Sequence, residues 1–134
     1  MLVQWTDDLS VGVKEIDEQH QIFLEILNDL CDTSCVLHSA PEITSILRQL
    51  STYASFHFAT EEKYFDKFGY ELATEHKEEH KKMLAKVAEF NKRFETEGDA
   101  ILTELLDFIE DWLIDHLSVQ DKKYTKCFNE HGLI

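Results

Sequence analysis

Apolar residues recur every three or four positions over most of this chain, which is the period of an amphipathic α-helix rather than of a strand. Only one proline and four glycines interrupt that pattern, so turn signals are few. Four helical stretches stand out, at about 17–37, 39–69, 71–95 and 99–128. We expect an all-α fold, an antiparallel up-down-up-down four-helix bundle with short loops.

Local signals mark several ends of these stretches. Residues 1–16 show no helical period, so we expect an irregular N-terminal arm that packs its apolar side chains across the bundle. Ser39 is placed to cap the second helix, with Glu42 as the third helical residue reaching back. Gly69 and Gly98 are the expected ends of the second and third helices.

Length, charge and hydropathy set limits on the class of protein. The 134 residues, 43% of them hydrophobic, are enough for one core, and we expect residues 1–134 to form a single domain. A formal charge of −14 argues against nucleic acid or an anionic membrane surface as a partner. No apolar run approaches the roughly 18 residues of a membrane span, and the N-terminus lacks a signal-peptide layout. We therefore expect a cytoplasmic protein.

The three cysteines, Cys31, Cys35 and Cys127, are an odd number in a chain without an export signal. A disulfide framework is not expected, and we interpret them as reduced thiols. Cys31 and Cys35 share a helix face at i, i+4, a spacing that also suits a redox or soft-metal role. Two ligands at one spacing are weak support for such a site, so we favour small, partly buried side chains.

Two pairs of potential metal ligands lie at i, i+4 on predicted helices, His57 with Glu61 and His76 with His80. This spacing leaves two side chains about 40° apart and one turn along the helix. Each pair can therefore present two ligand atoms to one small volume. A single pair carries little weight by itself.

The complete set of histidines is more informative. A lone histidine on an apolar face is usually an ordinary core or boundary residue. Here five of the seven histidines fall on inward faces, at least one on each helix: His20, His57, His76, His80 and His116. Burying so many unpaired rings would cost several kcal/mol. A metal centre would compensate that cost.

The donor count favours a pair of six-coordinate ions. If Glu61 and Asp121 each bridge two metals and a solvent-derived oxygen also bridges, these donors and the five imidazoles fill all but one position of two octahedra. Mixed nitrogen and oxygen ligation at such sites fits iron better than tetrahedral zinc or all-oxygen calcium sites. One coordination position remains open.

One spacing is unsuited to a regular α-helix. His116 and Asp121 are five residues apart, which separates their directions by about 140° at 3.6 residues per turn. We predict a π-type irregularity near residues 116–121.

Taken together, these segments resemble the hemerythrin family, specifically bacterial single-domain hemerythrins, along nearly the whole chain. The ligand order H, HxxxE, HxxxH, HxxxxD is complete. The matching segments are Val11-Gly12-Val13, Ile16-Asp17-Glu18-Gln19-His20, His57-Phe58-Ala59-Thr60-Glu61, His76-Lys77-Glu78-Glu79-His80, and Trp112-Leu113-Ile114-Asp115-His116 leading to Asp121. The resemblance also implies the four-helix bundle.

The resemblance implies a role for each ligand. One iron is expected on His76, His80 and His116, and the second on His20 and His57. Glu61, Asp121 and an oxo or hydroxo group would bridge the two irons. Dioxygen would then bind at the vacancy on the second iron, take two electrons from the pair and give them back on release.

The resemblance also suggests residues around the bound gas. By motif position, Phe58, Trp112 and Leu113 are candidates for an apolar pocket wall, although large apolar residues at helical spacing are also ordinary core fillers. Tyr124 matches a family tyrosine near the bridging carboxylates. Its alternative is a boundary tyrosine whose hydroxyl faces solvent.

The leading functional hypothesis is reversible dioxygen binding for storage, delivery or scavenging, without enzymatic activity. A di-iron oxidase or peroxidase is the second, although such centres usually employ more carboxylates than this chain offers. The third is an oxygen or redox sensor for a partner protein. We rank it lower because 134 residues leave no room for an output domain.

Overall fold

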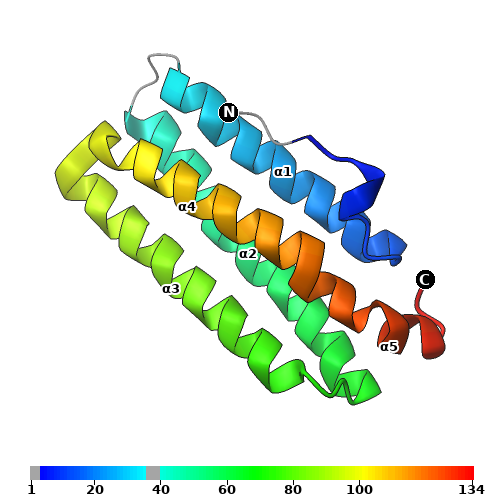
Figure 1. The fold of residues 1–134 in the computed structure, drawn as a ribbon. Helices are drawn as coiled ribbons and strands as arrows, with labels where there is room; N and C mark the ends of the chain where they lie inside the picture. The colour runs from blue at the N-terminus through cyan, green and yellow to red at the C-terminus, as the bar shows by residue number, and fades with distance from the viewer. Residues whose placement is uncertain (1–3, 36–39) are drawn as a thin grey trace.

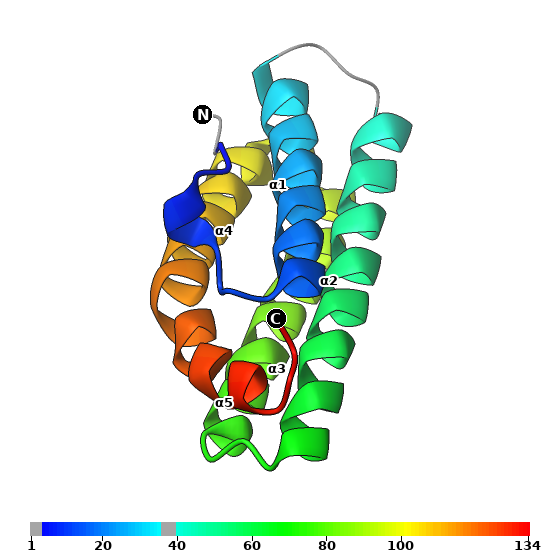
Figure 2. The ribbon, with the colours of Figure 1, turned by 90° about the vertical axis from the view of Figure 1, so that its right-hand side faces the viewer.

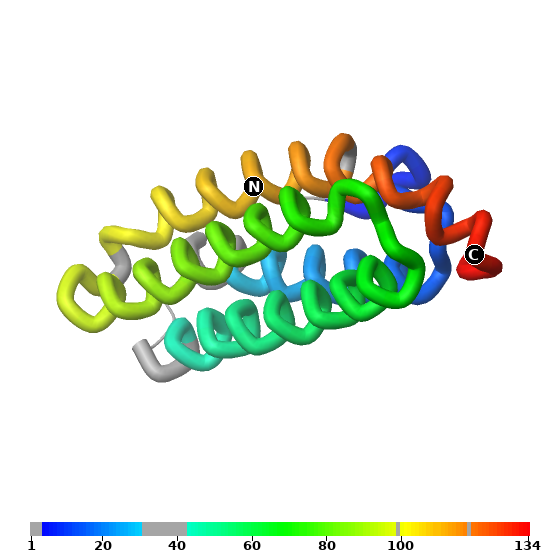
Figure 3. Tube along the Cα trace, turned by 90° about the horizontal axis from the view of Figure 1, so that it is seen from below, coloured from blue at the N-terminus to red at the C-terminus, as the bar shows by residue number. Residues whose placement is uncertain are grey.

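The computed structural model describes residues 4–35 and 40–134, with the side chains of 31–35, 40–42, 99 and 118 left out of the description. Within these ranges every regular element is helical and no strand is present. The long helices are α1 (Lys14–Cys35), α2 (Ala40–Phe68), α3 (Ala73–Glu97) and α4 (Leu102–Asp115). They run lengthwise beside one another as an antiparallel four-helix bundle (Figures 1 and 3), which confirms the predicted fold.

The fourth helical stretch is more broken than the sequence pattern suggests. It opens with a 3₁₀ turn, η2 (Gly98–Ile101), and after α4 it passes through a π turn and a second 3₁₀ turn before ending in a short α-helix. These later segments are η3 (His116–Gln120), η4 (Asp121–Tyr124) and α5 (Thr125–Glu130). They continue the direction of α4 toward the C-terminus (Figure 1).

The ends of α2 and α3 agree with the expected glycine signals. Gly69 and Gly98 follow the last residues of α2 and α3 with φ of 65° and 62°, a conformation that favours glycine. After Gly69, the amide of Tyr70 donates a hydrogen bond back to the carbonyl of Phe65 at 3.0 Å. α1 begins at Lys14, three residues before the expected start, while the predicted cap Ser39 lies outside the described residues.

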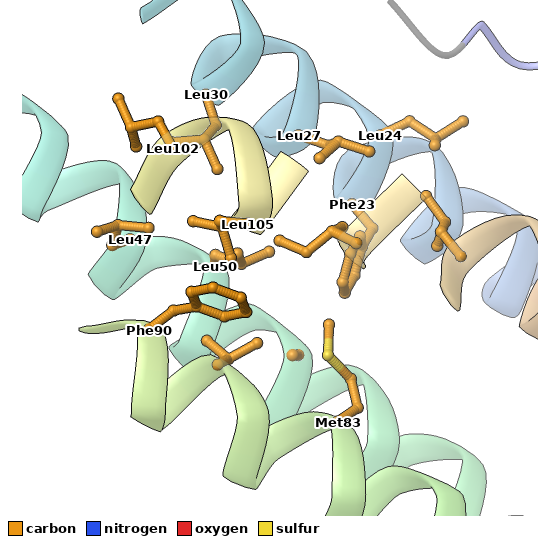
Figure 4. Packing of buried hydrophobic residues seen from close by; sticks show 14 of the residues in the cluster. Phe23, Leu24, Leu27, Leu30, Leu47, Leu50, Met83, Phe90, Leu102 and Leu105 are labelled. Carbon is orange, nitrogen blue, oxygen red and sulfur yellow. The ribbon is translucent and has the colours of Figure 1, made fainter. Parts of the chain in front are cut away.

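Apolar side chains form two clusters along the bundle axis. The larger one fills the half of the bundle that contains the α3–α4 connection, with members that include Phe23, Leu50, Met83, Phe90 and Leu105 (Figure 4). The smaller one lies at the other end. Its fully or nearly buried members are Val11, Val13, Ile16, Phe65, Tyr70, Tyr124 and Phe128. On α1, α2 and α3 the candidate ligands lie between residues of the two clusters.

The N-terminal arm lies against the bundle and its anchor is polar. The hydroxyl of Ser10 and the amide of Val11 donate to the carboxylate of Asp17 at 2.6 and 2.9 Å, and the hydroxyl of Thr125 donates to the carbonyl of Val11. Before this anchor the arm runs along the α1 and α4 side (Figure 2), where Trp5 packs on the larger cluster. The arm therefore covers the junction between the first and last helices.

No helix in the described part of the chain has the length and apolarity that crossing a bilayer requires.

Two isoleucines on α4 test the packing. Ile109 is fully buried and Ile114 is 48% exposed. We expect Ile109→Ala to lower the free energy of unfolding by about 2–5 kcal/mol, because it removes buried surface and leaves a cavity. The matched Ile114→Ala should cost less than about 1 kcal/mol. Urea unfolding followed by circular dichroism measures both, and equal losses would contradict the placement of the core.

Candidate metal centre

Seven polar side chains meet at one level of the bundle, between the two apolar clusters. α1 contributes one, α2 and α3 contribute two each at i, i+4, and the turns after α4 contribute the last two. None is more than 5% exposed. They are His20, His57, Glu61, His76, His80, His116 and Asp121. The structure thus brings together every residue that the sequence analysis selected as a metal ligand.

The π turn explains how the last two reach the same point. The amide of Asp121 donates to the carbonyl of His116, an i to i+5 hydrogen bond that adds one residue to the turn. This confirms the irregularity predicted from their spacing. The widened turn brings Nε2 of His116 to 2.7 Å from Oδ1 of Asp121.

The ligand atoms form two groups, in each of which all atoms lie within 4.8 Å of one another. One group contains Glu61, His76, His80 and His116, and the other contains His20, His57, Glu61 and Asp121. Glu61 belongs to both groups. Each group therefore has the size of a site for one metal ion.

Asp121 also faces both groups, with one oxygen toward each. Its Oδ1 lies 2.8 Å from Nε2 of His76, and its Oδ2 lies 3.0 Å from Nε2 of His20. Glu61 makes a similar link through Oε1, which lies 3.1 Å from Nε2 of His57 and 3.3 Å from Nε2 of His80. The two carboxylates thus lie between the two sets of imidazoles.

The carboxylates have no hydrogen bonds of their own. Both oxygens of Glu61 and both oxygens of Asp121 are buried without a hydrogen-bond partner, although imidazole nitrogens lie within 3.3 Å. Buried acceptors without donors are costly, and a cation placed among them would satisfy them together. The donor set therefore fits metal ions.

The pKa values of the ligands shift in different directions within this centre. Burial acts to raise the pKa of Asp121, but the imidazoles of His116, His20 and His76 outweigh it and hold that pKa well below its usual value. Burial and the neighbouring His57 lower the pKa of His20. These two shifts favour the forms that coordinate metals, an ionised carboxylate and a neutral imidazole. Burial acts to lower the pKa of His57 as well, but the charges of Glu61 and Asp121 outweigh it and raise that pKa.

Two further side chains form hydrogen bonds with the Nδ1 atoms of ligand imidazoles, on the side away from the centre. Sequence analysis did not identify these side chains. Nδ1 of His57 lies 2.7 Å from Oε1 of Gln19, and Nδ1 of His80 lies 2.9 Å from Oε2 of Glu62. Each is adjacent in sequence to a ligand, Gln19 to His20 and Glu62 to Glu61. Adjacency was the only available signal, and it does not indicate which ring each side chain reaches.

Large aromatic rings cover two of the imidazoles. Phe58 stacks on His80, with ring centroids 3.9 Å apart and planes 8° apart. Trp112 stacks on His116 at 4.2 Å and 15°. Both contacts exclude solvent from the group of three histidines.

The third wall candidate, Leu113, and the tyrosine expected near the carboxylates, Tyr124, are both buried. Leu113 is 2% exposed and packs in the larger cluster, while Tyr124 is fully buried. The burial of Tyr124 contradicts the alternative of a boundary residue in solvent, and its hydroxyl has no hydrogen-bond partner. Burial and then the charges of Asp121 and Glu61 raise the pKa of Tyr124 well above its usual value, so this hydroxyl stays protonated at neutral pH.

The cysteines stay apart from this centre wherever they are described. Cys127 is a half-buried free thiol on α5. The side chains of Cys31 and Cys35 lie outside the described part of the structure.

Comparisons with known proteins agree with this arrangement. Residues 11–127 match the family described as Hemerythrin HHE cation binding domain. The chain is 33% identical to the Bacteriohemerythrin of Clostridium acetobutylicum over 124 residues, which cover 90% of this chain and 96% of that relative. It is 31% identical to the Bacteriohemerythrin of Methylococcus capsulatus over 129 residues, covering 96% and 98%.

The fold agrees with solved structures too. A crystal structure of wild-type hemerythrin matches with a TM-score of 0.87 and 31% identity, over 95% of this chain and 98% of the other. Family match, sequence identity and fold all extend over most of the chain, and the residues matched by the family span the seven converging side chains. On this evidence the chain belongs to the hemerythrin family.

Proposed function

We propose that the seven converging side chains hold two iron ions and that the pair binds dioxygen reversibly. The observation that carries this proposal is the unequal division of the imidazoles around shared carboxylates. Three histidines face one side of Asp121 and Glu61, and two face the other. An iron pair held in this way would supply two electrons to dioxygen and recover them when the gas leaves.

His76, His80 and His116 would saturate one metal position. His20 and His57 would hold the other, which has one imidazole fewer. If both carboxylates and a solvent-derived oxygen were shared, the open coordination position would fall beside His20 and His57. Dioxygen as a ligand is therefore expected on that side.

The surroundings would protect bound dioxygen from water. All seven ligands are buried, and apolar clusters lie above and below them. We propose Phe58, Trp112 and Leu113 as apolar walls and Tyr124 as a neighbour of the bridging carboxylates. Excluding water and mobile proton donors limits side reactions of a bound ligand.

The composition of the centre also bears on the choice between binding and oxidation chemistry. Five neutral imidazoles and two carboxylates carry less negative charge than the carboxylate-rich centres of di-iron bundles that activate dioxygen. Less negative charge stabilises highly oxidised iron less well. Reversible binding for storage, delivery or scavenging is therefore favoured over catalysis.

Iron loading tests the proposal directly. Full-length protein supplied anaerobically with Fe²⁺ should retain about two iron ions per chain and, in air, develop a visible absorption band that disappears under vacuum and returns with dioxygen. Iron analysis, absorption spectra and an oxygen electrode provide the measurements. Continuing dioxygen consumption, well beyond about one molecule per iron pair, would indicate an oxidase instead.

Asp121 allows a test of the shared ligand. In Asp121→Asn a neutral amide replaces the carboxylate that faces both groups. Iron affinity should fall by more than the roughly 10- to 100-fold that loss of an outer hydrogen bond costs. Asp111→Asn, an exposed position on α4, is the control and should keep its iron. If Asp121→Asn binds two irons with unchanged affinity, the bridging role is wrong.

A further inference from the structure

Two of the ligand imidazoles have hydrogen bonds at their outer nitrogens, and the side chains that accept them differ in charge. Gln19 meets Nδ1 of His57 through a neutral amide, at 2.7 Å. Glu62 meets Nδ1 of His80 through a carboxylate, at 2.9 Å. His57 belongs to the group with two histidines and His80 to the group with three, so the two supports act on different metal positions.

Both contacts fix the same form of the ring. The Oε1 atom of Gln19 and the carboxylate of Glu62 can only accept hydrogen bonds, so Nδ1 of each imidazole must donate. The lone pair of each neutral ring then lies on Nε2, the atom that faces the centre. Each contact thus orients its ligand and leaves the coordinating nitrogen free of a proton.

Neighbouring hydrogen bonds support the orientation of the Gln19 amide. Its Nε2 donates to Oγ1 of Thr60 at 3.4 Å, while that hydroxyl donates its own hydrogen to the carbonyl of Phe56 at 3.1 Å. Because the Thr60 hydroxyl has already used its hydrogen, it can only accept from the amide. The oxygen of Gln19 must therefore be the atom that faces His57.

Gln19 also fixes α1 against α2 beside one metal position. It precedes His20 in the chain, and its carbonyl accepts a hydrogen bond from the Tyr53 hydroxyl at 3.0 Å. Its side chain is buried, with the residue 9% exposed, and it is uncharged. One buried, uncharged residue thus links the helices that carry His20 and His57.

Glu62 has a different character. Its carboxylate is 33% exposed, and it polarises the N–H of His80 more strongly than an amide would. A more polarised imidazole is a stronger electron donor through its other nitrogen. The outer nitrogens of His20 and His116 are buried without a partner, so these two rings do not offset the difference.

We propose that Gln19 and Glu62 are positioning residues. Through them the ligands at the His80 metal position donate more electron density to their metal ion than the ligands at the His57 position do. This inference rests on the proposed iron pair. It adds that the two positions of the iron pair differ. The position at His80 favours the oxidised ion, whereas the position at His57, beside the open coordination site, has a less electron-donating ligand because the Gln19 amide is uncharged.

The hydrogen bonds are tested by removing them. Metal-depleted full-length protein is titrated anaerobically with Co²⁺, and we expect two binding steps, the tighter one at the three-histidine position. Glu62→Leu should weaken the tighter step and Gln19→Leu the weaker step, each by about 10- to 100-fold. Gln21→Leu, at an exposed position on α1, is the matched control, and circular dichroism verifies the fold of each variant.

The charges are tested by exchanging them. Gln19→Glu and Glu62→Gln each keep an acceptor and should restore Co²⁺ affinity relative to the leucine variants. In the iron-loaded protein, followed by spectroelectrochemical titration, Glu62→Gln should raise the lower of the two reduction potentials. Gln19→Glu should lower the higher one, because a carboxylate stabilises ferric iron.

The outcomes separate this inference from the proposed function. If wild-type protein binds two metals and the leucine variants leave both steps unchanged, or weaken both steps equally, only the inference fails. The same holds if the two exchanges move the same potential in the same direction. If wild-type protein binds no metal, the iron pair and the inference fail together.

Discussion

The lone pairs of imidazole nitrogens and carboxylate oxygens lie close together in the buried middle of this bundle. Imidazole nitrogens lie 2.7 to 3.3 Å from carboxylate oxygens that have no hydrogen-bond donor. A helical protein could avoid that cost by filling the level with leucine, as it does above and below. The centre is therefore the part of the fold whose burial costs the most free energy. Burial of the two apolar clusters provides the folding free energy that holds its ligands in place.

Much of this follows from periodicity. The i, i+4 pairs His57 with Glu61 and His76 with His80 needed only the α-helical repeat, and a five-residue spacing was enough to predict the π turn before Asp121. The ends of α2 and α3 at Gly69 and Gly98 were likewise visible in the sequence. Such features are local, and local geometry can be derived from spacing alone.

The features that the sequence did not reveal depend on contacts between helices. Gln19 and Glu62 look like ordinary polar residues, and only the packing of α1 on α2 and of α2 on α3 shows which imidazole each one reaches. The burial of Tyr124 depends in the same way on where the segment after Asp121 lies. The breaking of the fourth helical stretch was foreseen at the π turn, but not at η2 or η4.

The order of the irregular turns has a further effect on the end of the chain. In η3 the backbone is underwound, so each residue rotates the chain by less than the roughly 100° of an α-helix, whereas η4 is overwound at about 120° per residue. Because the two segments follow each other directly, the angle by which η3 falls behind a regular α-helix and the angle by which η4 runs ahead of it largely cancel. α5 then resumes with nearly the azimuth of an uninterrupted helix, and Phe128 still points inward. The chain acquires an extra residue at the metal level without rotating its C-terminal end away from the bundle.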